Sequence, residues 1–335
     1  MSLSILRPGL LSTVQDLGRF GYQQEGIIVS GAMDACALRV ANLLVGNAEN
    51  AAVLEITLLG PLIRFEADHL IALTGAHLSP TLNSQPVGLH RPVWVAAGTE
   101  LDFGVPVAGS RAYLAVAGGV AVAPVLGSRS TYLRASFGGL HGRALRAGDV
   151  LPGAHPTPAG QRIIAALAAT ASSRIWMQAT WTPGLALCPT PLPNPTIRAV
   201  AGPEYEQFTP ASQQAFWQQP FTVTPDSDRM GYRLQGPPLQ RHTSAELLSS
   251  AVTFGTVQVP AGGQPIVLMA DHQTTGGYPR IAQVISVDFS ALAQVRPGQL
   301  VYFQEVSLAE AQALYLAREQ ELRALRRGIA TVFGN

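Results

Sequence analysis

The stretch Val53-Leu-Glu-Ile-Thr-Leu-Leu-Gly-Pro-Leu-Ile-Arg-Phe65 contains two short apolar runs separated by a Gly-Pro break. Apolar runs of about 4–8 residues bounded by turn residues are typical of β-strands rather than helices. Similar runs recur at residues 70–73, 93–97, 112–117, 256–259, 266–270 and 300–303. Glycine and proline supply breaks throughout, with 33 and 25 of the 335 residues. The sequence therefore predicts a mainly β, β-rich α+β fold with few helices.

Three segments carry helical signals instead. Residues 33–45 place apolar side chains on one helical face and stop at Gly46. Thr209-Pro210 has the pattern of an N-cap followed by proline at the first helical position, which predicts a helix over residues 211–218. Ser307-Leu-Ala-Glu310 is a capping-box pattern, and it predicts a long helix that continues to about residue 327.

A change in amino-acid composition and a weak internal repeat predict two related domains. Residues 152–195 are rich in Pro, Ala and Thr and resemble a domain junction, with a strand or helix at 163–168 and a strand near 174–178. Arg19-Phe-Gly-Tyr22 recurs as Arg229-Met-Gly-Tyr232. We predict an N-terminal domain over residues 1–185 with an inserted helix, and a C-terminal domain over 196–335 with a C-terminal helix.

All 22 basic residues are arginines, and the formal net charge is +1. The lack of lysine excludes a Schiff-base lysine, a Walker-A lysine and a lysine that carries biotin. Near-neutral charge without a basic stripe argues against nucleic-acid binding. Charged residues make only 13% of the chain, which fits either a large buried interface or a bias toward Ala and Gly.

The sequence also predicts a cytoplasmic protein that does not span a membrane. Arg7 and Pro8 interrupt the start of the chain before an apolar run of signal-peptide length forms. The apolar run 112–128 is interrupted by Gly118, Gly119 and Pro124, so two buried strands suit it better than a membrane span. Cys36 and Cys188 have no metal-type spacing; free thiols are expected, although one disulfide remains an alternative.

The densest polar cluster is Met269-Ala-Asp-His-Gln-Thr-Thr-Gly-Gly-Tyr-Pro-Arg280, between two predicted strands. Asp271 and His272 are candidates for acid/base chemistry, Thr274 and Thr275 for hydroxyl donors, and Arg280 for a fork that binds carboxylate or phosphate. The alternative is a hairpin held by Asx-turn and threonine hydrogen bonds.

Further candidates lie in the first half of the chain. Thr13-Val-Gln-Asp-Leu-Gly-Arg19 is followed by Val29-Ser-Gly-Ala-Met-Asp34, where Ser30 and Asp34 are placed to cap the next helix. Glu55 lies on an apolar strand and needs a buried partner, for which Arg19 or Arg111 is suited. Gly118-Gly119 and Leu126-Gly-Ser-Arg-Ser-Thr131 form a weaker candidate for holding an anion. The seven histidines show no metal-binding spacing.

Taken together and in this order, the motifs resemble the biotin-dependent carboxyltransferase-like family, also called allophanate hydrolase subunit 2, KipA or the 5-oxoprolinase C subunit. The resemblance covers about residues 4–310 and departs at His272, where many relatives have arginine. It is carried by the two motifs of the first half above and by Ala41-Asn-Leu-Leu-Val-Gly-Asn47, Leu54-Glu-Ile56, Ala115-Val-Ala-Gly-Gly119, Val125-Leu-Gly-Ser-Arg-Ser130, Asp228-Arg-Met-Gly-Tyr-Arg233, Gln258-Val-Pro260, Pro265-Ile-Val-Leu-Met-Ala-Asp271 and Gln273-Thr-Thr-Gly-Gly-Tyr-Pro279.

This resemblance implies two cyclophilin-like β-barrel domains. It also implies that the chain is the C subunit of an ATP-dependent 5-oxoprolinase. The enzyme, which also has an A and a KipI-like B subunit, hydrolyses 5-oxoproline (pyroglutamate) to glutamate using ATP and Mg²⁺. The alternatives are a KipA-like regulator that binds a KipI-like kinase inhibitor, and the carboxyltransferase part of a urea carboxylase or amidolyase. Biotin would then arrive on another chain or domain, since no lysine here can carry it covalently.

The candidate site residues fall into two groups. We expect catalytic roles for Asp271, Arg19, Gln273 and Thr274, and substrate binding by Arg229, Arg280, Glu55, Ser30 and Tyr278. No residues are assigned to a metal.

Overall fold

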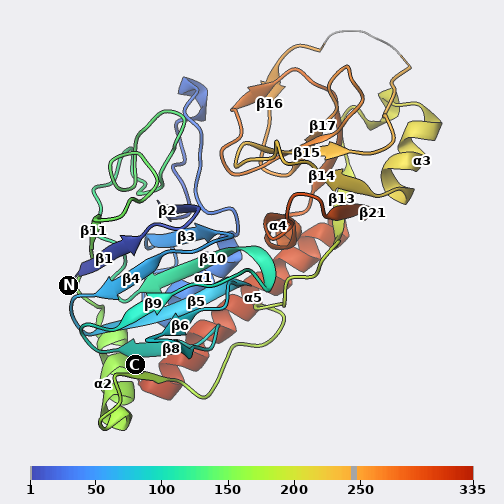
Figure 1. Ribbon diagram of the computed structural model, residues 1–335. Coiled ribbons are helices and arrows are strands. Elements are labelled where there is room, and N and C mark those ends of the chain that lie inside the picture. Colours follow the sequence, from blue (N-terminus) through green and yellow to red (C-terminus); the bar gives the residue numbers. More distant parts are fainter. Residues whose placement is uncertain (1, 243–246, 335) are drawn as a thin grey trace. The chain divides into compact units, whose positions relative to one another are not determined.

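The computed structural model describes residues 2–242 and 247–334 (Figure 1). Contacts divide the chain into two compact units. Unit 1 contains the residues up to 19, Asp34–Pro191 and the residues from 318 onward, and unit 2 contains Phe20–Met33 and Leu192–Ala317. The predicted domains, 1–185 and 196–335, are each continuous in sequence. The two units are not: Phe20–Met33 lies in the N-terminal part of the chain but belongs to unit 2, and the residues from 318 onward lie in the C-terminal part but belong to unit 1.

Unit 1 contains two antiparallel sheets of six strands each. The first has the order β11-β1-β4-β9-β6-β7, and the second has the order β12-β8-β5-β10-β3-β2. The strands are β1 (Ser2–Arg7), β2 (Leu11–Gln15), β3 (Val53–Thr57), β4 (Leu62–Phe65), β5 (His69–His77), β6 (Thr81–Leu82), β7 (Gln85–Pro86), β8 (Pro92–Val95), β9 (Glu100–Asp102), β10 (Ala108–Val116), β11 (Val150–Pro152) and β12 (Trp176–Gln178).

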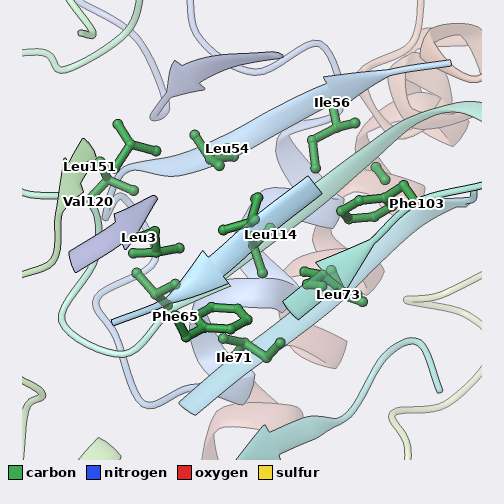
Figure 2. Packing of buried hydrophobic residues seen from close by; sticks show 14 of the residues in the cluster. Leu3, Leu54, Ile56, Phe65, Ile71, Leu73, Phe103, Leu114, Val120 and Leu151 are labelled. Atoms are coloured by element: carbon green, nitrogen blue, oxygen red, sulfur yellow. The ribbon is translucent and has the colours of Figure 1, made fainter. Parts of the chain in front are cut away.

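The core of unit 1 lies between the inner faces of these sheets (Figure 2). Leu3 and Phe65 come from the first sheet, and Ile71, Leu73 and Leu114 come from the second. Alternate residues of a strand point to opposite faces, so the other half of β5 and β10 faces away from this core. Those positions are buried as well, which explains the continuous apolar runs seen in the sequence.

Helices α1 (Ala35–Leu44) and α2 (Pro158–Ala171) pack on the second sheet of unit 1. The Asp34 carboxylate caps α1 by accepting a hydrogen bond from Ala37 N at 3.0 Å, and the Thr74 hydroxyl of β5 donates to the Ala37 carbonyl at 2.7 Å. Helix α5 (Leu308–Phe333) belongs to unit 1 from residue 318 onward. There Arg39 of α1 holds Glu319 of α5 with both Nη atoms.

Unit 2 is built on a closed barrel with the order β13-β20-β17-β18-β15-β14-β21. Its strands are β13 (Thr196–Ala201), β14 (Phe221–Val223), β15 (Gly231–Gln235), β17 (Thr256–Gln258), β18 (Ile266–Leu268), β20 (Arg280–Val284) and β21 (Leu300–Glu305), beside the short ribbon of β16 (Ser250–Ala251) and β19 (Thr275–Gly276). The helices of unit 2 are α3 (Pro210–Gln218), α4 (Phe289–Ala293), the first part of α5 up to residue 317, and short 3₁₀ helices at Gln23–Glu25, Tyr205–Gln207 and Ser286–Asp288. The barrel core includes Phe216 of α3 stacked on Phe303 at 4.6 Å between ring centroids.

The mainly β prediction is confirmed, as are the three predicted helices. Thr209 accepts a hydrogen bond from Ser212 N, and Ser307 accepts one from Glu310 N, so both caps form as their patterns indicate. The second strand predicted within residues 112–128 is wrong. After β10 the chain turns through Gly118 and Gly119 at positive φ and makes only isolated bridges. None of the helices in the described ranges is both long and apolar enough to cross a membrane.

The unit 1 core generates a stability prediction. Leu114→Ala leaves a cavity between the two sheets, where the leucine is 0% exposed, and we expect a loss of about 2–5 kcal/mol of unfolding free energy. The control Leu185→Ala, at a residue 80% exposed, should change it by less than about 0.5 kcal/mol. Urea denaturation followed by circular dichroism measures both. Equal effects of the two substitutions would contradict this picture of the core.

Candidate functional site

A buried ion pair between Arg229 and Asp271 forms the centre of the candidate site in unit 2. Arg229 precedes β15 and Asp271 follows β18, and the backbone N–H of Asp271 donates to the Arg229 carbonyl at 2.7 Å. Arg229 Nε lies 2.9 Å from Asp271 Oδ2, and Arg229 Nη2 lies 3.0 Å from Oδ1. The residues are 6% and 4% exposed, so this fork-to-carboxylate contact is shielded from water.

The segment Phe20–Met33 contributes to the same cluster. The Ser30 hydroxyl donates to Asp271 Oδ1 at 2.7 Å, and Arg229 Nη2 donates to the Gly31 carbonyl at 2.5 Å. Ser30 has a φ of 58°, which is a left-handed conformation uncommon for a residue with a Cβ. The bond to Asp271 offsets that strain, so Ser30 contributes to the cluster rather than capping α1.

The Asp271 carboxylate accepts several hydrogen bonds within this cluster. An ionised carboxylate has about four acceptor positions. Ser30 and Arg229 together donate three hydrogen bonds to it. Among the described residues, one acceptor position on Oδ2 therefore remains without a donor.

The loop after Asp271 contains the next two candidates. His272 Nδ1 lies 2.6 Å from the Gln273 carbonyl and so carries the proton, because a carbonyl oxygen only accepts. Burial lowers the pKa of His272 below its usual value, and the Gln273 carbonyl opposes this shift. The Gln273 side chain donates through Nε2 to Gln258 Oε1 at 3.4 Å.

Gln258 is a site residue that the sequence analysis missed. It ends β17, is 2% exposed, and its Nε2 has no hydrogen-bond partner among the described residues. A buried amide donor without an acceptor is costly, so this nitrogen is an unusual feature of the fold. Gly276 approaches this nitrogen so closely that an added Cβ would lie 2.4 Å away. The glutamine in the Gln258-Val-Pro260 motif was the available signal.

Three other candidates of this loop lie outside the ion-pair cluster. Arg280 Nε and Nη2 contact the two Glu204 carboxylate oxygens at 2.8 and 2.6 Å, so its fork already holds an internal anion. Tyr278 is 51% exposed. Thr274 is half-buried, and its carbonyl accepts a hydrogen bond from Val252 N.

Glu55 belongs to a different cluster, in unit 1. The register of β3 and β10 places Tyr113 directly opposite Glu55, and the Tyr113 hydroxyl donates to Glu55 Oε2 at 2.8 Å. The same hydroxyl accepts from Asp34 N at 2.8 Å, which ties the start of α1 to the sheet. Burial raises the pKa of Tyr113 well above its usual value, and the Glu55 charge adds to this effect.

Arg19 lies in a second unit 1 cluster, with Asp16. Arg19 is 1% exposed, donates through Nη2 to the Ser130 carbonyl at 2.5 Å, and lies 4.7 Å from the Phe137 ring centroid. The Asp16 carboxylate accepts from the Ser128 and Ser130 hydroxyls and from Arg129 N, each at 2.6 Å. The turn at Leu126–Thr131, which the sequence analysis gave as a weak candidate for holding an anion, thus binds the carboxylate of Asp16.

The structure therefore brings together Asp271, Arg229 and Ser30 in unit 2, and in the following loop it places the Gln273 side chain against Gln258. Arg19 and Glu55 lie in unit 1, in separate clusters. Neither the catalytic nor the substrate-binding assignments are tested by these positions, and they stay predictions. Within the described ranges, no group of three or more His, Cys, Asp or Glu side chains gathers closely enough to hold a metal ion.

Comparison with known proteins connects this arrangement to a family. A family model described as carboxyltransferase domain, subdomain A and B, matches residues 25–305. The chain is 48% identical to the C subunit of 5-oxoprolinase from Escherichia coli, over 92% of this chain and 93% of that protein. It is 43% identical to the Haemophilus influenzae protein of the same name, over 94% and 95%.

Solved structures agree with this relationship. The chain matches the crystal structure of Kluyveromyces lactis urea amidolyase with a TM-score of 0.85 and 28% identity, over 97% of this chain. It spans 20% of that much longer protein. The crystal structure of TTHA0988 matches with a TM-score of 0.75 and 34% identity, over 90% of this chain and 56% of that one.

The buried ion pair generates a prediction for stability. Asp271→Asn leaves the Arg229 guanidinium buried without its anion, and we expect a loss of about 3–5 kcal/mol. Arg229→Met/Asp271→Leu removes both charges and should lose less than the sum of the single variants. The exposed pair of Arg7 and Asp102 offers the control Asp102→Asn, expected to cost less than about 1 kcal/mol. Additive losses in the urea-denaturation cycle would show that the two side chains are not coupled.

The lowered pKa of His272 generates a prediction for pH. In the unfolded chain His272 takes up a proton near pH 6.5, whereas in the folded chain it does so at lower pH. Its contribution is therefore complete above pH 6.5 and is lost as the pH falls toward the folded pKa, with a slope of at most about 1.4 kcal/mol per pH unit.

His272→Gln should remove this part of the slope and leave the rest of the stability profile unchanged. Urea denaturation at a series of pH values measures it. Wild-type and His272→Gln profiles that run parallel from pH 8 to below 6.5 would contradict a buried, neutral imidazole.

Proposed function

Since the chain belongs to the family of carboxyltransferase domains with subdomains A and B, we propose that it is the C subunit of an ATP-dependent 5-oxoprolinase. The observation that carries the proposal is the 48% identity to a protein of that name over nearly the full length of both chains. A second relative of the same name matches over a similar share. The proposed complex contains this chain, an A and a KipI-like B subunit, and acts in the cytoplasm.

The proposed reaction opens a lactam, which is a poor electrophile. ATP, bound with Mg²⁺ elsewhere in the complex, supplies a phosphoryl group to the amide oxygen. Water then attacks the ring carbon, the ring nitrogen leaves as the new amino group, and phosphate is released. We assign no Mg²⁺ ligand to a particular residue of this chain.

Within this proposal, Asp271 is the candidate acid/base group. Arg229 and Ser30 orient its carboxylate and leave one acceptor position on Oδ2. Arg229 therefore acts by positioning Asp271, because its guanidinium group already binds the Asp271 carboxylate through two nitrogens. Gln273 and Thr274 remain candidates for orienting the substrate, and Gln258 Nε2 is a further donor for a carbonyl oxygen.

Arg19, Glu55, Tyr278 and Arg280 keep their proposed roles with different degrees of structural support. Arg19 carries a buried positive charge suited to an anion. Glu55 is a buried carboxylate held by Tyr113. Tyr278 is exposed enough to meet a substrate or a partner chain. Arg280 has the weakest support, since binding a substrate anion would require it to release Glu204.

A second candidate function is carboxyl transfer. It is favoured by 31% identity to urea amidolyase of Lachancea kluyveri over 98% of this chain, although the chain spans only 18% of that protein. Without lysine, this chain would receive carboxybiotin from another chain or domain. Inhibition of the reconstituted activity by avidin would favour this alternative, and full activity with avidin present would favour 5-oxoprolinase.

The test of the proposed function is reconstitution. The purified A, B and C subunits are mixed with ATP and Mg²⁺, and 5-oxoproline-dependent phosphate release and glutamate formation are measured together. We expect both products in equal amounts only when all three proteins are present. No release from the well-folded proteins would contradict the proposed function.

The same assay tests the site residues. Asp271→Ala should lower kcat by about 100-fold or more if the carboxylate transfers a proton, and Arg19→Ala should also lower the rate of phosphate release. Arg64→Ala, at an exposed arginine paired with Glu66, is the matched control and should leave the rate unchanged. Unchanged rates in both site variants would show that the assignments are wrong while the proposed function stands.

A further inference from the structure

The lining of a cavity in unit 1 contains none of the candidate site residues above. It is formed by the end of α1, the start of α2 and the last turns of α5, with a volume of about 360 Å³. Its apolar wall includes Leu43, Ile163, Ile329, Ala330 and Phe333. Small-molecule sites in proteins have this character: mostly apolar walls, a few hundred Å³ of space and a small number of placed polar groups.

The elements that form the cavity are joined by hydrogen bonds and by one close backbone approach. The Thr157 hydroxyl donates to the Gly46 carbonyl at 2.6 Å and accepts from Gly160 N, which joins the end of α1 to the start of α2. Gly46 has a φ of 73°, and an added Cβ would lie 2.5 Å from Gly160 N, so only glycine permits this approach. At the far wall, Phe333 packs against Trp181 with 6.1 Å between ring centroids.

Two arginines, Arg162 of α2 and Arg326 of α5, contribute the positive charge of the lining. Arg162 Nε is buried and has no hydrogen-bond partner within the described part of the chain. Elsewhere Arg39, Arg229 and Arg280 each hold a carboxylate through two nitrogens. Among the described lining residues of this cavity none is Asp or Glu, so no lining side chain neutralises the two guanidinium groups.

From this juxtaposition we propose that the cavity binds a small organic carboxylate with an apolar body, such as a medium-chain fatty acid or an aryl-alkanoic acid. The carboxylate interacts with the guanidinium groups of Arg162 and Arg326. The apolar body contacts Ile163, Ile329 and Phe333. An inorganic anion would leave the apolar wall unused, and a neutral hydrocarbon would leave the two guanidinium charges of the lining without an anion.

The test compares three probes that share one alkyl chain: octanoate, 1-octanol and octylammonium. Isothermal titration calorimetry with the full chain should show saturable binding of octanoate at one site, at least tenfold tighter than binding of the other two. Equal affinity for all three would overturn the role of the arginines. No saturable octanoate binding at millimolar concentration would overturn the site itself.

Variants locate the binding. Arg162→Met should weaken octanoate at least tenfold and leave 1-octanol unchanged, whereas Ala330→Phe fills the cavity and should weaken both. Arg327→Met, at the exposed neighbour of Arg326 that is outside the lining, is the matched control and should leave octanoate binding unchanged. If Arg162→Met unfolds, Arg326→Met gives the same comparison. Equal weakening by the lining and control variants would overturn the proposal in favour of general charge attraction.

Discussion

An arginine that folding removes from water needs acceptors for its N–H groups, and this requirement organises the polar interior of the chain. In unit 2, Arg229 meets it with the Asp271 carboxylate and the Gly31 carbonyl. Three segments far apart in sequence are joined by those bonds: the start of β15, the end of β18 and the stretch Phe20–Met33. Because every Lys or Arg position of this protein is an arginine, planar two-point contacts with a carboxylate recur, as at Arg39, Arg198 and Arg280.

This need for acceptors distinguishes arginines whose guanidinium groups are paired within the protein from those that could bind a ligand. Arg280 is saturated by Glu204, and Arg198 holds both oxygens of Asp288. These guanidinium groups would have to break an internal pair before they could bind a substrate anion. Arg162 has a buried nitrogen without an acceptor in the described chain, beside an apolar cavity. The two kinds of arginine are indistinguishable in sequence, because the difference lies in what is packed around each fork.

Features that depend on a few neighbouring residues could be predicted from sequence. The caps at Thr209 and Ser307 formed as expected, because a capping hydrogen bond spans only three residues. The contact between Glu55 and Tyr113 could not be predicted in this way. The register of β3 and β10 places the Tyr113 hydroxyl directly beside the carboxylate, and that register is a property of the whole sheet. Gln258 was missed for a similar reason, since its unsatisfied amide is visible only once its neighbours are in place.

By itself, the sequence determined that the chain is mainly β, where three of its helices lie, that lysine chemistry is excluded, and which family it resembles. Those properties follow from composition, local spacing and motif order. The tertiary structure alone decided that Ser30 contacts Asp271 across 241 positions of sequence, and that residues 20–33 belong to unit 2 while residues from 318 onward belong to unit 1. Such pairings depend on strand register and on how buried charges are matched across the chain, and neither is encoded in a local pattern.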